Sequence, residues 1–328
     1  MFPAQLGYRF PAEWAPHAAT WLSWPHKEAS WPGKIQSIYG VYAQFVKALT
    51  DGEQVCINVN DAAMQAEAED WLRQAGTDLT KVSFYHHPTN DAWCRDHGPA
   101  FLANPTALLR KVIVKWKYNA WGEKYPPHDL DNLIPFRIGE VRHVPVFQPG
   151  IVMEGGAVDF NGRGTVLTTT SCLLNPNRNP HLSQAQIEEY LHNFYGVAHV
   201  DDITRFVNED TVVTAVEPNV HDENHAPLQE NLETLRKMRL ENGQPLNIVE
   251  LPMPGPVVYD GQRLPASYAN FYIGNTVVAV PTFRDPNDEK ALRILETCFP
   301  GRTVIGFDST DIIWGLGSFH CLSQQEPL

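Results

Sequence analysis

Residues 157–167 read AVDFNGRGTVL, an apolar run followed by a polar, glycine-containing turn and a second apolar run. This pattern is typical of a tight β-hairpin, because glycine permits the turn that joins two short strands. Two further stretches repeat it, 205–213 (RFVNEDTVV) and 270–278 (NFYIGNTVV). Hairpins that recur along a chain indicate repeated modules, although their spacing is too irregular for a repeat at the level of the sequence.

Helical and strand-like segments alternate around these hairpins from one end of the chain to the other. The predicted helices are 35–50, 61–75 with Asn60 as N-cap, 183–195 with a capping box of Ser183 and Gln186, 227–242, and 288–299. The predicted strands are 20–24, 55–59, 107–115, 166–170, 211–216 and 276–280. Neither a linker nor a dinucleotide-binding glycine fingerprint interrupts this order. We therefore predict a single α/β domain over residues 1–328.

Composition and charge exclude several classes of protein. Hydrophobic residues make up 43% of the 328 positions, which is enough for a large core and excludes a disordered chain. Lys and Arg number 25 against 38 Asp and Glu, so the net charge is −13. A protein that binds nucleic acid needs a basic face. We therefore do not expect this protein to bind nucleic acid. A cationic substrate is compatible with the acidic balance.

The sequence predicts neither a membrane-spanning helix nor a signal peptide. No apolar run approaches the roughly 20 residues of a membrane helix, and residues 1–5 do not resemble a signal peptide. The cysteines are odd in number and contain no C-x-x-C motif. They are Cys56, Cys94, Cys172, Cys298 and Cys321. This usage predicts reduced thiols and a cytoplasmic protein without a membrane partner.

Cys321 stands in a setting that suits a nucleophile. The stretch 315–325 reads GLGSFHCLSQQ, in which glycines permit close approach of a ligand. A thiolate is the reactive form, and the neighbouring His320 is one way to favour it. The alternative is an inert, buried cysteine near the end of the chain.

A histidine and several carboxylates stand in other short segments. His199 and Asp201 alternate on a predicted strand and point to one side, which suits a base with its carboxylate partner, a metal pair, or a solvated strand end. Asp96 lies in a turn-rich stretch, where the alternative is an ion pair with Arg95. Glu154 precedes two glycines, where the alternative is an ordinary turn.

The combination narrows the chemistry. A cysteine protease needs a thiol, a histidine and one amide or carboxylate, not several carboxylates. Carboxylates around a thiol raise its pKa unless a cation is present, and a guanidinium substrate would supply one. At ~4 Å and an effective dielectric constant of ~20, each contact between carboxylate and guanidinium gains roughly 4 kcal/mol before desolvation. Paired carboxylates can hold the planar guanidinium through two hydrogen bonds each.

The ordered motifs resemble the family of agmatine deiminases and bacterial, Porphyromonas-type peptidyl-arginine deiminases, which belong to the pentein superfamily. The matches extend over nearly the whole chain. They are 11–14 (PAEW), 17–21 (HAATW), 93–99 (WCRDHGP), 119–122 (NAWG), 154–156 (EGG), 174–180 (LNPNRNP), 199–201 (HVD), 267–272 (SYANFY) and 320–325 (HCLSQQ).

The resemblance implies a fold, a reaction and a set of roles. The fold would be a five-bladed α/β propeller of ββαβ-type modules around a central acidic pocket. Cys321 would attack the guanidinium carbon, and His199 would protonate the departing ammonia and then activate water. The other implied roles are guanidinium binding by Asp96 and Asp201, orientation of His199 or a further contact by Glu154, and flanking of the substrate stem or narrowing of the entrance by Trp93 and Trp121. Neither a metal nor an organic cofactor is expected.

Several departures from the motifs bear on the substrate. Leu316 and Ser318 interrupt the glycine-rich loop of agmatine-specific members, His97 stands where Thr or Asn is common, and the segment 121–154 is shorter. We expect agmatine to be hydrolysed to N-carbamoylputrescine in polyamine synthesis. Peptidyl-arginine is the runner-up, followed by another small guanidine. Outside this class, the alternatives are a binding protein without turnover and a metal-dependent hydrolase using His199 and Asp201. Family members often self-associate, so a homo-oligomer is compatible with the resemblance.

Overall fold

The computed structural model describes residues 1–197, 199–201 and 204–328, and of residues 199–201 it describes only the backbone. The helices are α1 (Ile35–Thr50), α2 (Ala62–Ala75), α3 (Cys94–His97), α4 (Ala120–Glu123), α5 (Ile134–Arg142), α6 (Thr170–Leu173), α7 (Gln184–Tyr195), α8 (His225–Lys237), α9 (Asp288–Cys298) and α10 (Phe319–Leu322). The strands are β1 (His17–Ser23), β2 (Gln54–Val59), β3 (Val82–His86), β4 (Ala100–Ala103), β5 (Lys111–Val114), β6 (Val146–Phe147), β7 (Val158–Phe160), β8 (Thr165–Thr168), β9 (His199–Asp201), β10 (Arg205–Phe206), β11 (Thr211–Val216), β12 (Asn247–Pro252), β13 (Val258–Tyr259), β14 (Gln262–Arg263), β15 (Tyr272–Ile273), β16 (Val277–Thr282), β17 (Thr303–Asp308) and β18 (Ser323–Pro327).

Most sheets follow one plan, an antiparallel hairpin extended by a parallel strand. This plan holds for β4-β5-β6, β7-β8-β9, β10-β11-β12 and β15-β16-β17. A short turn can join antiparallel strands, whereas a parallel neighbour requires a crossover connection. Helices α5, α7, α8 and α9 lie within these crossovers. The hairpins predicted at 157–167, 205–213 and 270–278 are confirmed.

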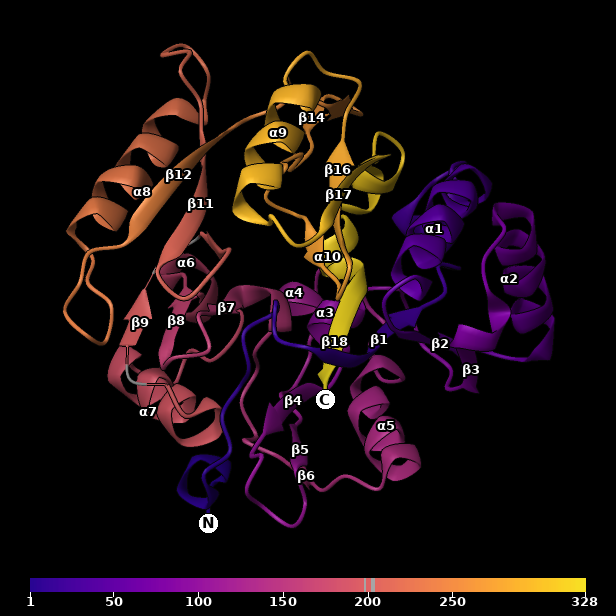
Figure 1. The fold of residues 1–328 in the computed structure, drawn as a ribbon, viewed down its shortest axis with the longest axis horizontal. Coiled ribbons are helices and arrows are strands. Elements are labelled where there is room, and N and C mark those ends of the chain that lie inside the picture. The colour runs from indigo at the N-terminus through magenta and orange to yellow at the C-terminus, as the bar shows by residue number, and fades with distance from the viewer. Residues whose placement is uncertain (198, 202–203) are drawn as a thin grey trace.

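A further sheet, β18-β1-β2-β3, joins the two ends of the chain. Strand β18 pairs antiparallel with β1, so that Gln324 lies opposite Trp21. In Figure 1 the sheets surround the middle of the molecule, with α1, α2, α5, α7, α8 and α9 outside and α3, α4 and α10 near the centre. The mixed α/β fold is confirmed, and its topology packs the short helices α3 and α10 against each other.

Local signals account for most helix boundaries, with one wrong cap. The helix predicted at 35–50 is α1, and the capping box of Ser183 and Gln186 opens α7. Helix α2 is capped by Asp61, which accepts a hydrogen bond from the Met64 N–H at 2.9 Å. The predicted cap at Asn60 is wrong because that side chain accepts the N–H of Thr89, which lies on another segment.

The largest differences from the predicted boundaries occur at one helix and one strand. Helix α8 covers residues 225–237 rather than 227–242, because a turn forms there in which the Leu240 N–H donates to the Gln244 carbonyl at 2.8 Å. Strand β5 begins at Lys111 rather than at residue 107, because Asn104 closes a turn by accepting the N–H of Thr106. Both errors arise where an apolar run continues into a turn.

An aromatic core beneath α1 supports the centre of the molecule. Its largest buried members include Trp24, Trp31, Phe45, Trp93 and Phe319. Phe319 belongs to α10, and its ring lies 4.9 Å from that of Phe45. The core therefore anchors α10 from one side. No helix in the described ranges has both the length and the apolar character needed to cross a membrane.

Candidate active site

Cys321 lies in α10, behind a loop that requires glycine. A Cβ atom at Gly317 would come within 2.6 Å of the Trp93 ring and 3.1 Å of Cys321 Sγ, so a larger residue would displace one of them. Cys321 is only partly buried, unlike Cys56 and Cys94. Its partial exposure, which Cys172 and Cys298 share, is compatible with a reactive thiol.

Two departures from the family motif keep the geometry of this loop. Leu316 adopts φ +69°, a left-handed conformation that glycine would take more easily. Ser318 is buried, and its hydroxyl shares a hydrogen bond of 2.9 Å with that of Ser309. The third departure, His97, is also buried, and burial lowers its pKa to about 3. The fold therefore accommodates all three departures, with Ser318 and His97 buried and Leu316 in a left-handed conformation.

Asn270 holds the turn of Cys321 through both atoms of its amide. Its Nδ2 donates to Cys321 Sγ at 3.1 Å, and its Oδ1 accepts the N–H groups of His320 at 3.1 Å and Cys321 at 3.4 Å. Sequence reasoning quoted Asn270 only within a motif and assigned it no role. No local sequence pattern indicates this role, because the partners of Asn270, His320 and Cys321, lie on a distant segment of the chain.

The surroundings of the Cys321 thiol oppose its ionisation when no cation is present. Burial raises the pKa of Cys321, and the charge of Asp96 raises it further. The hydrogen bond from Asn270 and the charge of Arg95 act in the opposite direction but do not outweigh these effects. A cation bound next to Asp96 would therefore shift the thiol toward thiolate.

His320 does not favour the thiolate, contrary to expectation. Burial lowers the pKa of its imidazole to about 3, and the charges of Arg205 and Arg95 add to this effect. Its Nε2 lies 3.0 Å from Glu13 Oε2 in the interior. The imidazole next to Cys321 thus disfavours the protonated form and contacts Glu13.

Asp96 presents a partly buried carboxylate near Cys321. Its Oδ1 accepts the N–H of Gly156 at 2.8 Å and its Oδ2 accepts Trp121 Nε1–H at 3.0 Å. Burial and the charge of Glu154 raise its pKa to about 7. A carboxylate in this state gains from a bound cation, because the cation offsets both unfavourable effects.

Glu154 lies in the same region and is 2% exposed. It accepts a hydrogen bond from Arg178 Nε at 2.5 Å, and Cys172 Sγ lies 3.7 Å from its other oxygen. A Cβ at Gly155 would lie 2.1 Å from the carbonyl oxygen of Arg95, so glycine lets this segment lie against α3. Glu154 therefore precedes a turn, as the alternative had it, but its carboxylate is also buried and held by Arg178. Sequence reasoning recognised the motif 174–180 but not the role of Arg178.

The two tryptophans line the site from different depths. Trp93 is 2% exposed, and its ring lies 5.2 Å from that of Trp31. Trp121 is partly buried, lies 6.3 Å from Trp93 between ring centroids, and fixes Asp96. Trp93 thus supports the loop of Cys321, while Trp121 contacts the carboxylate directly.

His199 and Asp201 form strand β9, whose backbone pairs in parallel with β8. His199 lies opposite Thr165 and Asp201 opposite Leu167. Their side chains lie outside the described residues, so their predicted roles stay predictions, and so does the metal pair. Within the described residues, no group of three or more His, Cys, Asp or Glu side chains could hold a metal ion.

The described residues bring together a thiol, the buried carboxylate of Glu154 and the partly buried carboxylate of Asp96. Helix α3, which carries Asp96, packs against α10 on one side and against the turn 155–157 that follows Glu154 on the other. A ligand with a positive charge and several N–H donors suits the carboxylates, and the thiol can attack an electrophilic carbon held between them.

Comparison with known proteins agrees with this chemistry. The family of Porphyromonas-type peptidyl-arginine deiminases matches residues 9–327. The agmatine deiminase of Stutzerimonas stutzeri is 34% identical over 365 residues, covering 99% of this chain and 97% of its own. The agmatine deiminase structure from Enterococcus faecalis is 29% identical with a TM-score of 0.93, covering 99% and 97% of the two chains. A cysteine-to-serine agmatine deiminase from C. jejuni with substrate bound is 28% identical with a TM-score of 0.87, covering 97% and 96%.

Proposed function

This chain belongs to the family of Porphyromonas-type peptidyl-arginine deiminases, and from that membership we propose that it is an agmatine deiminase. Such an enzyme is a hydrolase that acts on a C–N bond of a linear amidine. The observation that carries the proposal is the thiol of Cys321 near the partly buried carboxylate of Asp96. A guanidinium bound there would offset the negative charge and favour the thiolate.

The reaction proceeds in two halves. Cys321 Sγ attacks the guanidinium carbon of agmatine, and the C–N bond breaks as His199 gives a proton to the leaving ammonia. The product of this half is a thiouronium bound to Cys321. His199 then takes a proton from water, the water oxygen attacks the same carbon, and the C–S bond breaks. N-carbamoylputrescine and the free thiol result, so one water is consumed for each ammonia released.

The carboxylates and tryptophans hold the substrate for these steps. Asp96 and Asp201 bind guanidinium N–H groups, which are matched to carboxylate oxygens in geometry and charge. Glu154, itself held by Arg178, orients His199 or adds a further contact. Trp121 fixes Asp96 through its indole N–H and, with Trp93, flanks the aliphatic stem.

The fold suits a central site of this kind. We propose that the five sheets of three or four strands form the five blades of one α/β propeller, and that residues 1–328 make a single domain. The shared plan of the sheets and the outer position of the helices support this arrangement. Each blade then contributes a segment to the middle.

Ammonia release by the purified protein tests the function. We expect turnover of agmatine in preference to free arginine and a blocked arginine peptide. Cys321→Ala should abolish release, whereas Cys298→Ala, on α9, should retain it. Preference for the peptide would assign the runner-up substrate class to the same chemistry. Agmatine binding without ammonia release from any guanidine would contradict the proposal and favour a binding protein.

A further inference from the structure

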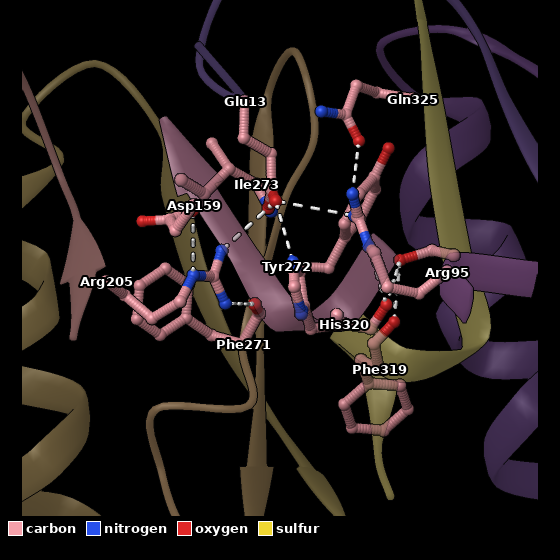
Figure 2. A network of polar contacts seen from close by, with 12 residues as sticks. Glu13, Arg95, Asp159, Arg205, Phe271, Tyr272, Ile273, Phe319, His320 and Gln325 are labelled. Carbon is pink, nitrogen blue, oxygen red and sulfur yellow. Dashed lines mark hydrogen bonds and ion pairs between the residues drawn. The ribbon is translucent and has the colours of Figure 1, made fainter. Parts of the chain in front are cut away.

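We propose that Glu13, near the start of the chain, is a positioning residue for Cys321, near its end. The inference rests on the proposed function and adds a residue that acts on the nucleophile through its neighbours. Glu13 belongs to the motif 11–14, to which the active site described above assigns no role. Figure 2 shows it at the centre of a network of polar contacts in the interior.

Glu13 gathers groups from several distant segments. Its Oε1 accepts the N–H of Ile273 at 2.9 Å. Its Oε2 lies 3.3 Å from Arg95 Nη2, 3.1 Å from Arg205 Nη2 and 3.0 Å from His320 Nε2. Burial alone would raise its pKa, but the charges of Arg205 and Arg95 and the hydrogen bond from His320 outweigh burial and hold the pKa well below its usual value. These contacts favour the ionised form of Glu13.

Arg95 connects this anion to the segment of the nucleophile. Its Nε donates to the carbonyl oxygen of His320 at 3.2 Å, and its Nη1 donates to Gln325 Oε1 at 2.7 Å. His320 immediately precedes Cys321, so Arg95 fixes the backbone at which α10 turns. Arg95 forms its ion pair with Glu13, and the alternative pair with Asp96 is absent from the described contacts.

Arg205 connects the same anion to the segment of Asn270. Its Nη1 donates to the carbonyl oxygens of Ala269 at 3.1 Å and Phe271 at 2.9 Å, the residues on either side of Asn270. Asn270 in turn donates to Cys321 Sγ. One carboxylate thus holds two arginines, and each arginine holds one of the two segments that set the position of the thiol.

The network also adjoins Asp96 of the candidate site. Glu13, Arg95 and His320 line the same cavity as Asp96. Arg205 forms a second ion pair with Asp159 at 3.3 Å, so two arginines face two carboxylates. Loss of the Glu13 charge leaves this balance positive next to Cys321, whose pKa the charge of Arg95 already lowers.

Glu13→Gln tests the proposal because it keeps the size of the side chain and removes its charge. Glu53→Gln is the matched control. Glu53 is also a buried glutamate, at 6% exposure, and accepts the N–H of Asn275 at 2.7 Å. None of its described contacts involves Cys321, His320 or Asn270. Folding of both variants is checked by thermal unfolding before activity is measured.

Two readouts separate positioning from general stability. We expect kcat on agmatine to fall at least about tenfold in Glu13→Gln, since small displacements of a nucleophile are costly, and to stay within about threefold in Glu53→Gln. In substrate-free protein, the pH midpoint for alkylation of Cys321 by iodoacetamide should fall by about half a pH unit or more in Glu13→Gln only.

A kcat of Glu13→Gln within about threefold of the unaltered protein would overturn the proposal. A loss of kcat shared by Glu53→Gln, with no shift of the alkylation midpoint, would overturn it as well.

If Glu13→Gln does not fold, Glu13→Asp takes its place, keeping the charge and shortening the side chain. It should lower kcat by at least about tenfold, and retention of kcat would overturn the proposal equally. Absence of agmatine turnover in the unaltered protein would instead refute the proposed function, and the alkylation midpoint would still decide the role of Glu13.

Discussion

Two carboxylates, the partly buried Asp96 in the candidate site and the buried Glu13 in the polar network, have pKa shifts of opposite sign. Asp96 lies near Glu154, and its pKa is raised to about 7. Glu13 lies near Arg95 and Arg205, and its pKa is held well below the usual value. Burial opposes ionisation of both groups, so the neighbouring charges decide the difference.

The two carboxylates differ in the cations around them. Glu13 lies between Arg95 and Arg205. In the candidate site Arg178 pairs with Glu154, while Asp96 forms no ion pair among the described contacts, and the proposed guanidinium substrate would supply its cation. Residues 95 and 96 are adjacent in the chain, and yet one serves the network and the other the site.

Removing the charge of Asp96 should have the largest effect. We expect Asp96→Asn to lower kcat/KM for agmatine about 10³-fold, because a charge-assisted contact to the guanidinium is lost. Asp159→Asn, which alters the network, should lower it far less. Steady-state kinetics on the two purified variants make the comparison. Equal losses would mean that the site and the network are not functionally distinct.

The pH dependence of kcat/KM should report the ionisation of Asp96. Asp96 is ionised above a pKa of about 7. Because a cation binds the ionised form, kcat/KM for agmatine should fall about tenfold per pH unit below that value. A pH profile from 5 to 9, with agmatine fully protonated throughout, measures the effect. In Asp96→Asn, the residual activity should no longer fall below pH 7. If the fall persists in this variant, another group is responsible for it.

Covalent labelling should reveal the charge of the site without turnover. A cationic haloacetamidine should alkylate Cys321 at least about tenfold faster than the neutral haloacetamide, because the carboxylates attract the cation. Mass spectrometry of the labelled peptide measures both rates. Asp96→Asn should remove most of the difference. Equal rates in the unaltered protein would contradict an acidic pocket around the thiol.

The smallest expected effect concerns backbone strain beside the nucleophile. Leu316 has φ +69° and is 45% exposed, so Leu316→Gly relieves strain and loses little burial. The free energy of unfolding should rise by about 0.5 kcal/mol, because relief of the left-handed strain exceeds the entropic cost of glycine. Urea unfolding measures the change. Leu108→Gly, at a fully exposed leucine without positive φ, should be destabilising, and a similar loss at Leu316 would show that the loop is not strained.

Much of the fold could be predicted because its signals are local. The hairpins at 157–167, 205–213 and 270–278 and the capping box at Ser183 depend on residues a few positions apart. Where a boundary depended on a distant partner, as at Asn60, the prediction failed. The family membership was also predictable, since its motifs are distributed along nearly the whole chain.

Less of the candidate site could be predicted. Cys321, Asp96 and Glu154 were identified by residue type and motif, and the structure brings them into one region. Asn270 and Arg178 were missed as individual contributors, because each acts on a segment far away in the chain. His320 was misjudged because adjacency to Cys321 does not reveal which way an imidazole turns.

The amino-acid sequence by itself determined the repeated strand and helix modules, the family, and the thiol available for catalysis. Only the tertiary structure decided which charges face one another. Coulombic energy depends on the distance between groups and on their removal from water, and neither follows from order along the chain. Arg95 and Asp96 are consecutive, but the fold directs Arg95 to Glu13 and Asp96 to Gly156 and Trp121. With that separation, the charge of Asp96 raises the pKa of the Cys321 thiol while Arg95 holds Glu13.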